Sequence, residues 1–197
     1  RKRIGRIRRE LANLESSRNT QRKHRASSGV FRVALAGYTN AGKSSLMNAL
    51  TDSDVLAYDK LFATLDSTTR ALELPGSSKV TLTDTVGFIQ KLPHNLVEAF
   101  HSTLDEIREA DLVLLVVDAA SPQRAAQLKA VQDVLGQIGA SGIPRIVVFN
   151  KIDLIEHDCI AELDHLRVLH PDAAFISAKT GSGIEDLLVR LESEVAS

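Results

Sequence analysis

Short apolar runs alternate along this chain with longer stretches in which apolar residues recur at helical spacing. The apolar runs are typical of strands, and the amphipathic stretches are typical of helices. The predicted strands are residues 30–37, 70–76, 79–85, 111–120, 144–150 and 173–177. The predicted helices are residues 43–50, 95–109, 123–135, 158–169 and 184–194. This alternation predicts an α/β fold with a doubly wound, six-stranded and mostly parallel sheet.

The run "LVLLVV" (112–117) is apolar at every position, as expected for the centre of a parallel sheet covered on both faces. It is far too short to span a bilayer. Right-handed crossovers would bring the carboxyl ends of the parallel strands to one edge. We therefore expect ligand-binding residues at that edge.

The segment "GYTNAGKSS" lies between the first strand and the first helix. The spacing Gly37-x-x-x-x-Gly42-Lys43-Ser44 matches the P-loop, whose backbone N–H groups surround a polyphosphate. Lys43 is expected to reach the β- and γ-phosphates, and Ser44 to ligate Mg²⁺. The alternative, an ordinary glycine-rich turn, is disfavoured by the Lys-Ser pair. The expected nucleotide contacts of this loop are Gly37, Tyr38, Thr39, Asn40, Ala41, Gly42, Lys43, Ser44 and Ser45.

A carboxylate and a glycine follow the third predicted strand in "DTVG". Asp84 is expected to hold Mg²⁺ through water, opposite Ser44. Gly87 can offer its backbone N–H to the γ-phosphate without a side chain in the way. The residues of this segment that we expect at the nucleotide are Asp84, Thr85, Val86 and Gly87.

Three threonines in "LFATLDSTTR" are candidates for the second Mg²⁺ ligand. Thr64 is favoured because it lies in a polar loop that could fold over the nucleotide. Thr68 and Thr69 directly precede the strand around Ala71, so we expect them to start that strand. The candidate contacts of this loop are Phe62, Ala63, Thr64, Leu65 and Asp66.

Two further motifs follow the last two predicted strands and indicate which base is bound. In "NKID", Asp153 can accept hydrogen bonds from N1–H and the 2-amino group of guanine, an edge that adenine lacks. Asn150 and Lys151 would brace the loop and cover the base. In "SAK" (Ser177, Ala178 and Lys179), backbone N–H groups can meet the guanine oxygen. The four motifs, in this order and each after a strand, predict GTP and GDP as ligands.

The net charge of −1 hides an asymmetry along the chain. Residues 1–25 hold ten basic and two acidic side chains, whereas the other 172 residues have a net charge of −9. Ile4, Ile7, Leu11 and Leu14 form an a/d seam on a predicted basic helix, with no partner helix nearby. We expect residues 1–25 to be the end of a truncated helical domain and residues 26–197 to be the GTPase domain. The charge favours an RNA partner over a merely solvated helix.

The motif set "GYTNAGKSS", "LFATLDSTTR", "DTVGFIQKLPHNLVEAFHSTLDEI", "NKIDL" and "SAKTGSGI" resembles the HflX family of translation-associated GTPases. This resemblance implies a Ras-like GTPase domain behind a ribosome-binding N-terminal module. It implies Mg²⁺-dependent GTP hydrolysis and binding to the large ribosomal subunit, with ribosome splitting or rescue under stress. By family motif, Lys43, Ser44 and Thr64 bind the phosphates and Mg²⁺.

The residue that orients the attacking water is not evident, because Phe88 stands where Ras-like enzymes often carry a glutamine. Either Gln90 or another group takes this role, or a partner completes the site. Asn40 lies where related GTPases place a K⁺ ligand, although it could equally brace the loop. Lys43, Thr64 and Gly87 are the expected catalytic residues, and hydrolysis without a partner should be slow.

Two functions follow: a GTP-hydrolysing switch on ribosomes, or a scaffold in ribosome assembly that docks according to the bound nucleotide and hydrolyses GTP incidentally. A single cysteine, Cys159, is typical of a reducing compartment, and we expect a cytoplasmic monomer with no membrane span.

Overall fold

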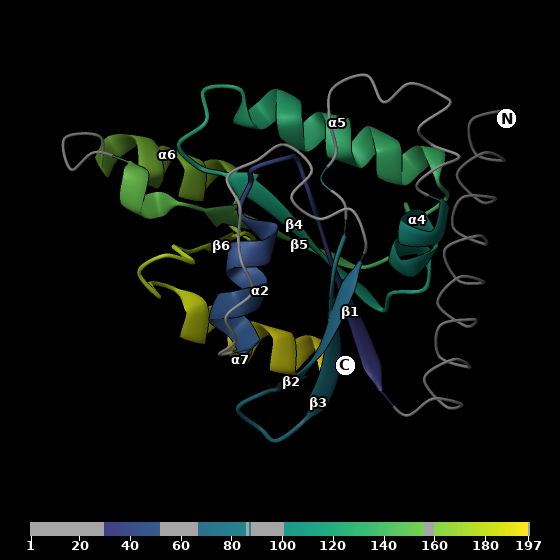
Figure 1. The fold of residues 1–197 in the computed structure, drawn as a ribbon. Helices are drawn as coiled ribbons and strands as arrows, with labels where there is room; N and C mark the ends of the chain where they lie inside the picture. Colours follow the sequence, from purple (N-terminus) through teal and green to yellow (C-terminus); the bar gives the residue numbers. More distant parts are fainter. Residues whose placement is uncertain (1–29, 52–66, 86, 88–100, 156–159, 197) are drawn as a thin grey trace, which may run out of the picture.

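The computed structural model describes residues 30–51, 67–85, 87, 101–155 and 160–196. A six-stranded sheet in the order β2-β3-β1-β4-β5-β6 forms its centre (Figure 1). Among the described strands, β2 and β3 pair in antiparallel fashion, and the other four pairs are parallel. The strands are β1 (Phe31–Gly37), β2 (Thr68–Glu73), β3 (Lys79–Asp84), β4 (Leu112–Asp118), β5 (Arg145–Asn150) and β6 (Ala174–Phe175). The predicted six-stranded, mostly parallel sheet is confirmed.

Helices cover both faces of the sheet (Figure 1). The helices α2 and α7 lie on one face, and α4, α5 and α6 lie on the other. Their bounds are α2 (Lys43–Thr51), α4 (His101–Arg108), α5 (Arg124–Gln137), α6 (Ile160–Leu169) and α7 (Ile184–Val195). A short 3-10 helix, η1 (Ile152–Leu154), was not predicted from the sequence.

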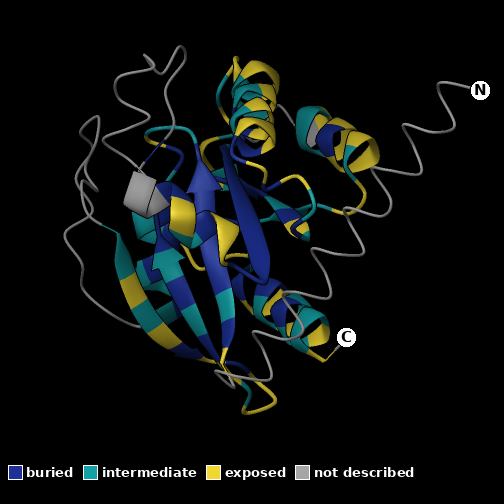
Figure 2. Cartoon of the chain, turned by 90° about the vertical axis from the view of Figure 1, so that its right-hand side faces the viewer, coloured by how far each residue is buried: buried dark blue, intermediate teal, exposed yellow. Residues whose placement is uncertain are grey.

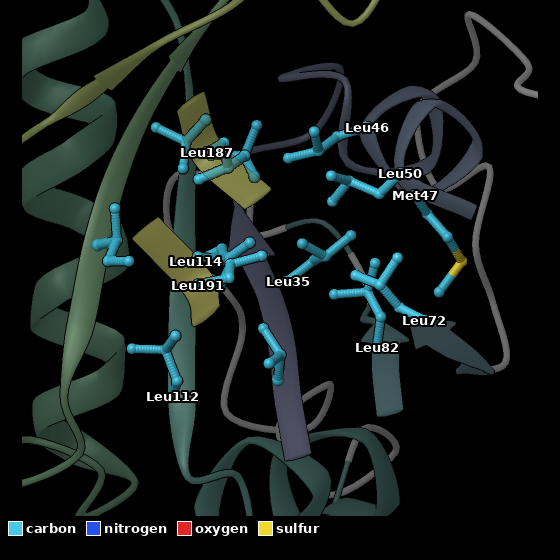
Figure 3. Close-up of a cluster of buried hydrophobic side chains, with 14 of the residues drawn as sticks. Leu35, Leu46, Met47, Leu50, Leu72, Leu82, Leu112, Leu114, Leu187 and Leu191 are labelled. Carbon is cyan, nitrogen blue, oxygen red and sulfur yellow. The ribbon is translucent and has the colours of Figure 1, made fainter. Parts of the chain in front are cut away.

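Three clusters of buried apolar side chains follow from this layering: one on the face of α2 and α7, and two on the other face, of which the smaller lies between β5 and α6. On one face, Leu46 of α2 and Leu187 of α7 pack against Leu35 of β1 and Leu114 of β4, and all four are fully buried (Figure 3). The other face is built from Ile107 of α4 and small or branched residues of β1, β4 and α5. Figure 2 shows that the helices are buried mainly where they meet the sheet. Burial of six successive residues of β4 explains why its sequence is apolar without alternation.

The observed elements agree with the predicted ones within a few residues. β2 begins at Thr68, as expected from the position of Thr68 and Thr69. β6 is shorter than predicted and contains two residues. The predicted helix at 95–109 is described only from His101, and the predicted basic helix in residues 1–25 lies outside the described residues. Within the described ranges, no helix is long and apolar enough to cross a membrane.

Candidate nucleotide-binding site

The carboxyl ends of the parallel strands meet at one edge of the sheet, where the sequence predicted the site. Leu35 of β1 pairs with Asp84, the last residue of β3. Gly37, the last residue of β1, pairs with Val116 of β4. Asp118 pairs with Asn150 at the ends of β4 and β5. Strand register therefore brings the P-loop, Asp84 and the "NKID" segment together.

Two P-loop glycines are required by close packing within the protein. A Cβ on Gly37 would lie 2.3 Å from the backbone oxygen of Val116, so any side chain would push β1 away from β4. Gly42 has a φ of 91°, and a Cβ there would lie 2.3 Å from Nδ2 of Asn150. Glycine relieves both the positive φ and the contact. The two glycines thus let the phosphate loop fit against β4 and against the base-recognition motif.

Lys43 begins α2 and points back into the loop. Its side chain is buried, and Nζ donates to the carbonyl oxygens of Gly37 and Tyr38 at 3.3 Å each. Burial lowers the pKa of Lys43 to about 8, while the nearby Asp84 carboxylate acts in the opposite direction. Burial removes water from the Lys43 ammonium, and the two carbonyl oxygens replace that hydration only in part. A bound anion would stabilise the charged form, so this ammonium is suited to bind one.

Ser44 and Asp84 form a pair of oxygen donors beside Lys43. The Ser44 hydroxyl donates to Oδ2 of Asp84 at 2.6 Å, and Asp84 is buried. A hydroxyl and a carboxylate are hard oxygen donors of the kind that Mg²⁺ prefers. These two residues, from α2 and β3, therefore fit the predicted position of a nucleotide-bound Mg²⁺.

Gly87 lies directly over the phosphate loop. A Cβ on Gly87 would come within 2.9 Å of Thr39 Cα and 3.1 Å of Lys43 Nζ. Its backbone is thus close to where Lys43 presents its charge. The Thr85 hydroxyl, by contrast, donates to the Leu35 carbonyl at 2.6 Å, so only the main chain of Thr85 remains for a nucleotide.

Asn150 joins three loops through one amide side chain. Its Nδ2 donates to the carbonyl oxygen of Ala41 at 3.1 Å. Its Oδ1 accepts from the backbone N–H groups of Lys151 at 2.8 Å and Ala178 at 3.0 Å. Asn150 is buried, so these contacts fix the P-loop and the "SAK" segment to the end of β5.

Asp153 stands exposed on η1, and its carboxylate is oriented by a serine. The Ser177 hydroxyl donates to Oδ1 of Asp153 at 2.6 Å and also accepts from the backbone N–H of Thr180 at 3.2 Å. Ser177 is fully buried. The sequence indicated only a backbone role for Ser177 and did not reveal this orienting role of its hydroxyl. A serine that follows a strand carries no sequence sign of which carboxylate it will meet.

The other predicted contacts are distributed around this centre. Asn40 is exposed with a φ of 60°, and Tyr38, Thr39 and Ser45 are partly buried. Lys179 is exposed. The remaining predicted site residues lie outside the described residues: Phe62, Ala63, Thr64, Leu65, Asp66 and Val86, as do Phe88 and Gln90.

Known proteins are similar to this chain in sequence and in fold. The sequence model of the 50S ribosome-binding GTPase family matches residues 32–151. GTPase HflX of Caldanaerobacter subterraneus subsp. tengcongensis is 50% identical over 99% of this chain and 44% of its own length. The chain thus spans less than half the length of this relative.

Solved structures extend the likeness to three dimensions. A GTP-binding protein from Sulfolobus solfataricus, in complex with GDP, superposes with a TM-score of 0.66 at 27% identity, over 99% of this chain and 58% of that one. Era in complex with MgGDPNP and a segment of 16S ribosomal RNA gives the same TM-score at 26% identity, over 84% of this chain and 56% of Era. The Ras-like P-loop fold and the resemblance to HflX GTPases are both confirmed. The chain belongs to the family of 50S ribosome-binding GTPases.

Proposed function

We propose that this chain is the GTP-hydrolysing switch of a protein that binds the large ribosomal subunit. The observation that carries the proposal is the junction of the P-loop, the Ser44–Asp84 pair and the Asp153–Ser177 pair at one edge of the sheet. The P-loop and the Ser44–Asp84 pair suit a nucleoside triphosphate with Mg²⁺. The Asp153–Ser177 pair suits the hydrogen-bond donors of guanine.

In this proposal Lys43 and the P-loop amides neutralise the phosphates, and Gly87 offers its N–H to the γ-phosphate. Ser44, Thr64 and, through water, Asp84 would hold Mg²⁺. When bound, Mg²⁺ would offset the negative charge of the β- and γ-phosphates. Lys151 covers the base while Asp153 recognises it. These roles agree with the relatives, which are named GTPases.

Hydrolysis by this site alone is expected to be slow, since Phe88 cannot orient a water molecule. Unassisted Ras-like sites work at roughly 10⁻⁴ to 10⁻² per second. We infer that a partner orders the segment after Gly87, or that Gln90 reaches the water. A tenfold stimulation corresponds to about 1.4 kcal/mol of barrier.

Purified large ribosomal subunits provide the test of the switch. In the full-length protein, which includes the N-terminal module, GTP hydrolysis should rise at least tenfold when subunits are added, and the stimulation should fade from low to moderate salt because phosphate contacts release counterions. ATP should give no hydrolysis above background. A scaffold would instead bind subunits in its GTP form without any stimulation, and that result would reject the switch.

The basic segment 1–25 is proposed to contact ribosomal RNA. Replacing Arg6, Arg8 and Arg9 with Ala should weaken co-sedimentation with subunits while nucleotide affinity stays intact. Replacing Arg145, Arg167 and Arg190 with Ala removes equal charge from the nucleotide domain and serves as the control. Equal co-sedimentation of the first variant and the wild type would exclude this segment.

The finer role that we propose is splitting or rescue of stalled ribosomes under stress, in the cytoplasm. It follows from the resemblance to HflX GTPases, and 70S particles supply its test. With GTP, the full-length protein should convert 70S particles to subunits, as seen on a sucrose gradient. A non-hydrolysable GTP analogue should slow the subsequent release of the protein from the large subunit. Unchanged 70S peaks would favour an assembly role.

A further inference from the structure

Asp118, the last residue of β4, lies beside the proposed base-binding loop but belongs to none of the four nucleotide motifs. Its Oδ2 accepts from Nζ of Lys151 at 2.8 Å. Its other oxygen, Oδ1, accepts from the backbone N–H of Ala120 at 3.0 Å and so closes the turn after β4. The two carboxylate oxygens thus serve two separate contacts.

The Lys151 ammonium also donates to the carbonyl oxygen of Asn40 in the P-loop, at 2.7 Å. Asn40 and Lys151 both have left-handed backbone conformations, with φ values of 60° and 66°. Such conformations are rare outside glycine and need support from their surroundings. One ammonium therefore ties together β4, the loop after β5 and the phosphate loop.

Among the ion pairs in the part of the chain that the structure describes, this pair has both side chains less than a quarter exposed, whereas in the pair Arg124–Glu162 the glutamate is 42% exposed. The side chains of Lys151 and Asp118 are 23% and 21% exposed, whereas those of the pair Lys129–Asp133 on α5 are 72% and 59% exposed. An exposed pair contributes little to stability, because water screens it and both side chains lose rotamer freedom. A pair that is mostly shielded and shares a third contact is better able to hold a long side chain in one position.

We propose that Asp118 is a positioning residue that holds Lys151 over the nucleotide and thereby slows nucleotide dissociation. This inference rests on the proposed guanine-nucleotide site. Without the carboxylate, Lys151 keeps only its contact to the Asn40 carbonyl, and its side chain regains rotamer freedom. The phosphate loop and the base-binding loop then lose one of the contacts that couple them, and the bound nucleotide escapes faster.

Asp118→Asn tests the ion pair without removing the turn contact. The amide keeps an oxygen for the Ala120 N–H and turns donor hydrogens toward the ammonium. Dissociation of a fluorescent GDP analogue, chased with excess GDP in a stopped-flow instrument, should become about tenfold faster. Asp133→Asn removes a carboxylate from the exposed Lys129 pair and should leave the rate within twofold of the wild type.

A double-mutant cycle with Lys151→Met separates positioning from a purely structural role. Lys151→Met alone should accelerate GDP dissociation at least tenfold, and adding Asp118→Asn should accelerate it no further. The thermal midpoint of the nucleotide-free protein should change by less than about 3 °C in Asp118→Asn. If Asp118→Asn fails to fold, Asp118→Glu displaces the carboxylate by one methylene, and the same dissociation measurement is made on that variant.

Three results would overturn the inference: an unchanged GDP dissociation rate in Asp118→Asn, additive effects in the double variant, or acceleration that merely follows a large loss of thermal stability. Failure of the proposed guanine-nucleotide site is distinguishable, because wild-type protein would then bind neither GDP nor GTP and no dissociation rate could be recorded.

Discussion

The two ends of the candidate site are built differently. The proposed base-binding part, made of Asn150, Lys151, Asp153 and Ser177, is fixed by side-chain hydrogen bonds of 2.6 to 3.2 Å. The proposed phosphate-binding part, residues 37–45 with Asp84, also contains the short Ser44–Asp84 bond of 2.6 Å, but its shape depends mainly on the backbone, and its lysine is held by two contacts of 3.3 Å.

This difference reflects what each part recognises. A base is distinguished by the direction of a few hydrogen bonds, so its carboxylate must be oriented before the ligand arrives. A polyphosphate is recognised by charge and by backbone N–H groups, so the loop needs close packing and a buried cation. We therefore expect the base-binding part to confer specificity, and the phosphate-binding part, with its buried lysine, to be stabilised by an anion.

The largest expected effect concerns the base-binding part. Asp153→Asn should weaken GTP binding roughly a thousandfold, about 4 kcal/mol, because the amide meets the guanine donors with a donor of its own. Binding should shift toward xanthosine triphosphate, whose 2-oxo group accepts where guanine donates. Calorimetric titration with both nucleotides provides the measurement. Asp164→Asn, on an exposed carboxylate of α6, is the control, and unchanged GTP affinity of Asp153→Asn would disprove the assignment.

Close packing in the phosphate-binding part predicts the next effect. Gly37→Ala should lower the free energy of unfolding by about 3 kcal/mol, because its Cβ would meet the Val116 backbone oxygen. Gly136→Ala in α5 has room for a Cβ and should raise stability by about 0.5 kcal/mol. Urea denaturation of both variants, without nucleotide, measures the contrast. Equal stabilities would show that the strands separate easily at this edge.

The buried ammonium supplies a third test. Lys43→Met should abolish GTP binding yet raise the free energy of unfolding of the nucleotide-free protein by about 2 kcal/mol at pH 7. The pKa of Lys43 falls from 10.5 to about 8 on folding. Burial of the charged lysine therefore lowers the free energy of unfolding at any pH at which the lysine is protonated in both the folded and the unfolded state. That cost is fully present below about pH 8 and is relieved as pH rises toward 10.5.

Chemical denaturation of wild type and Lys43→Met between pH 7 and pH 10 measures this cost. The difference in free energy of unfolding between Lys43→Met and the wild type should become smaller as pH rises. Lys79→Met, at an exposed position of β3, should show no such gap. A nucleotide-free Lys43→Met that is less stable than the wild type at pH 7 would show that the two carbonyl contacts outweigh the burial of charge.

The smallest expected effect concerns the monovalent ion. If Asn40 helps to hold K⁺, hydrolysis should be roughly threefold faster in KCl than in NaCl, less than 1 kcal/mol of barrier. Asn40→Ala should remove the difference. Choline chloride serves as the reference salt without an alkali-metal ion. Equal rates in both salts would assign Asn40 to bracing the loop alone.

Local patterns predicted most of the fold. The uninterrupted apolar run of β4 and the alternation of strands and helices sufficed for the sheet, because each element must bury one or both of its faces. The length of β6 and the presence of η1 were not predictable in this way. Both depend on where Ile176 and Ile152 find backbone partners in a neighbouring segment, and these partners are distant in sequence.

The sequence by itself determined which chemical groups stand at the end of each strand: the glycines and lysine of the P-loop, the carboxylates of Asp84 and Asp153, and the amide of Asn150. A short motif is sufficient to identify such groups, because residues that are close in sequence lie on the same turn or loop. Only the tertiary structure decided that Asp118 meets Lys151, that Ser177 orients Asp153 and that Gly42 makes room for Asn150. Strand order and register create these contacts, and both arise from packing of the whole sheet.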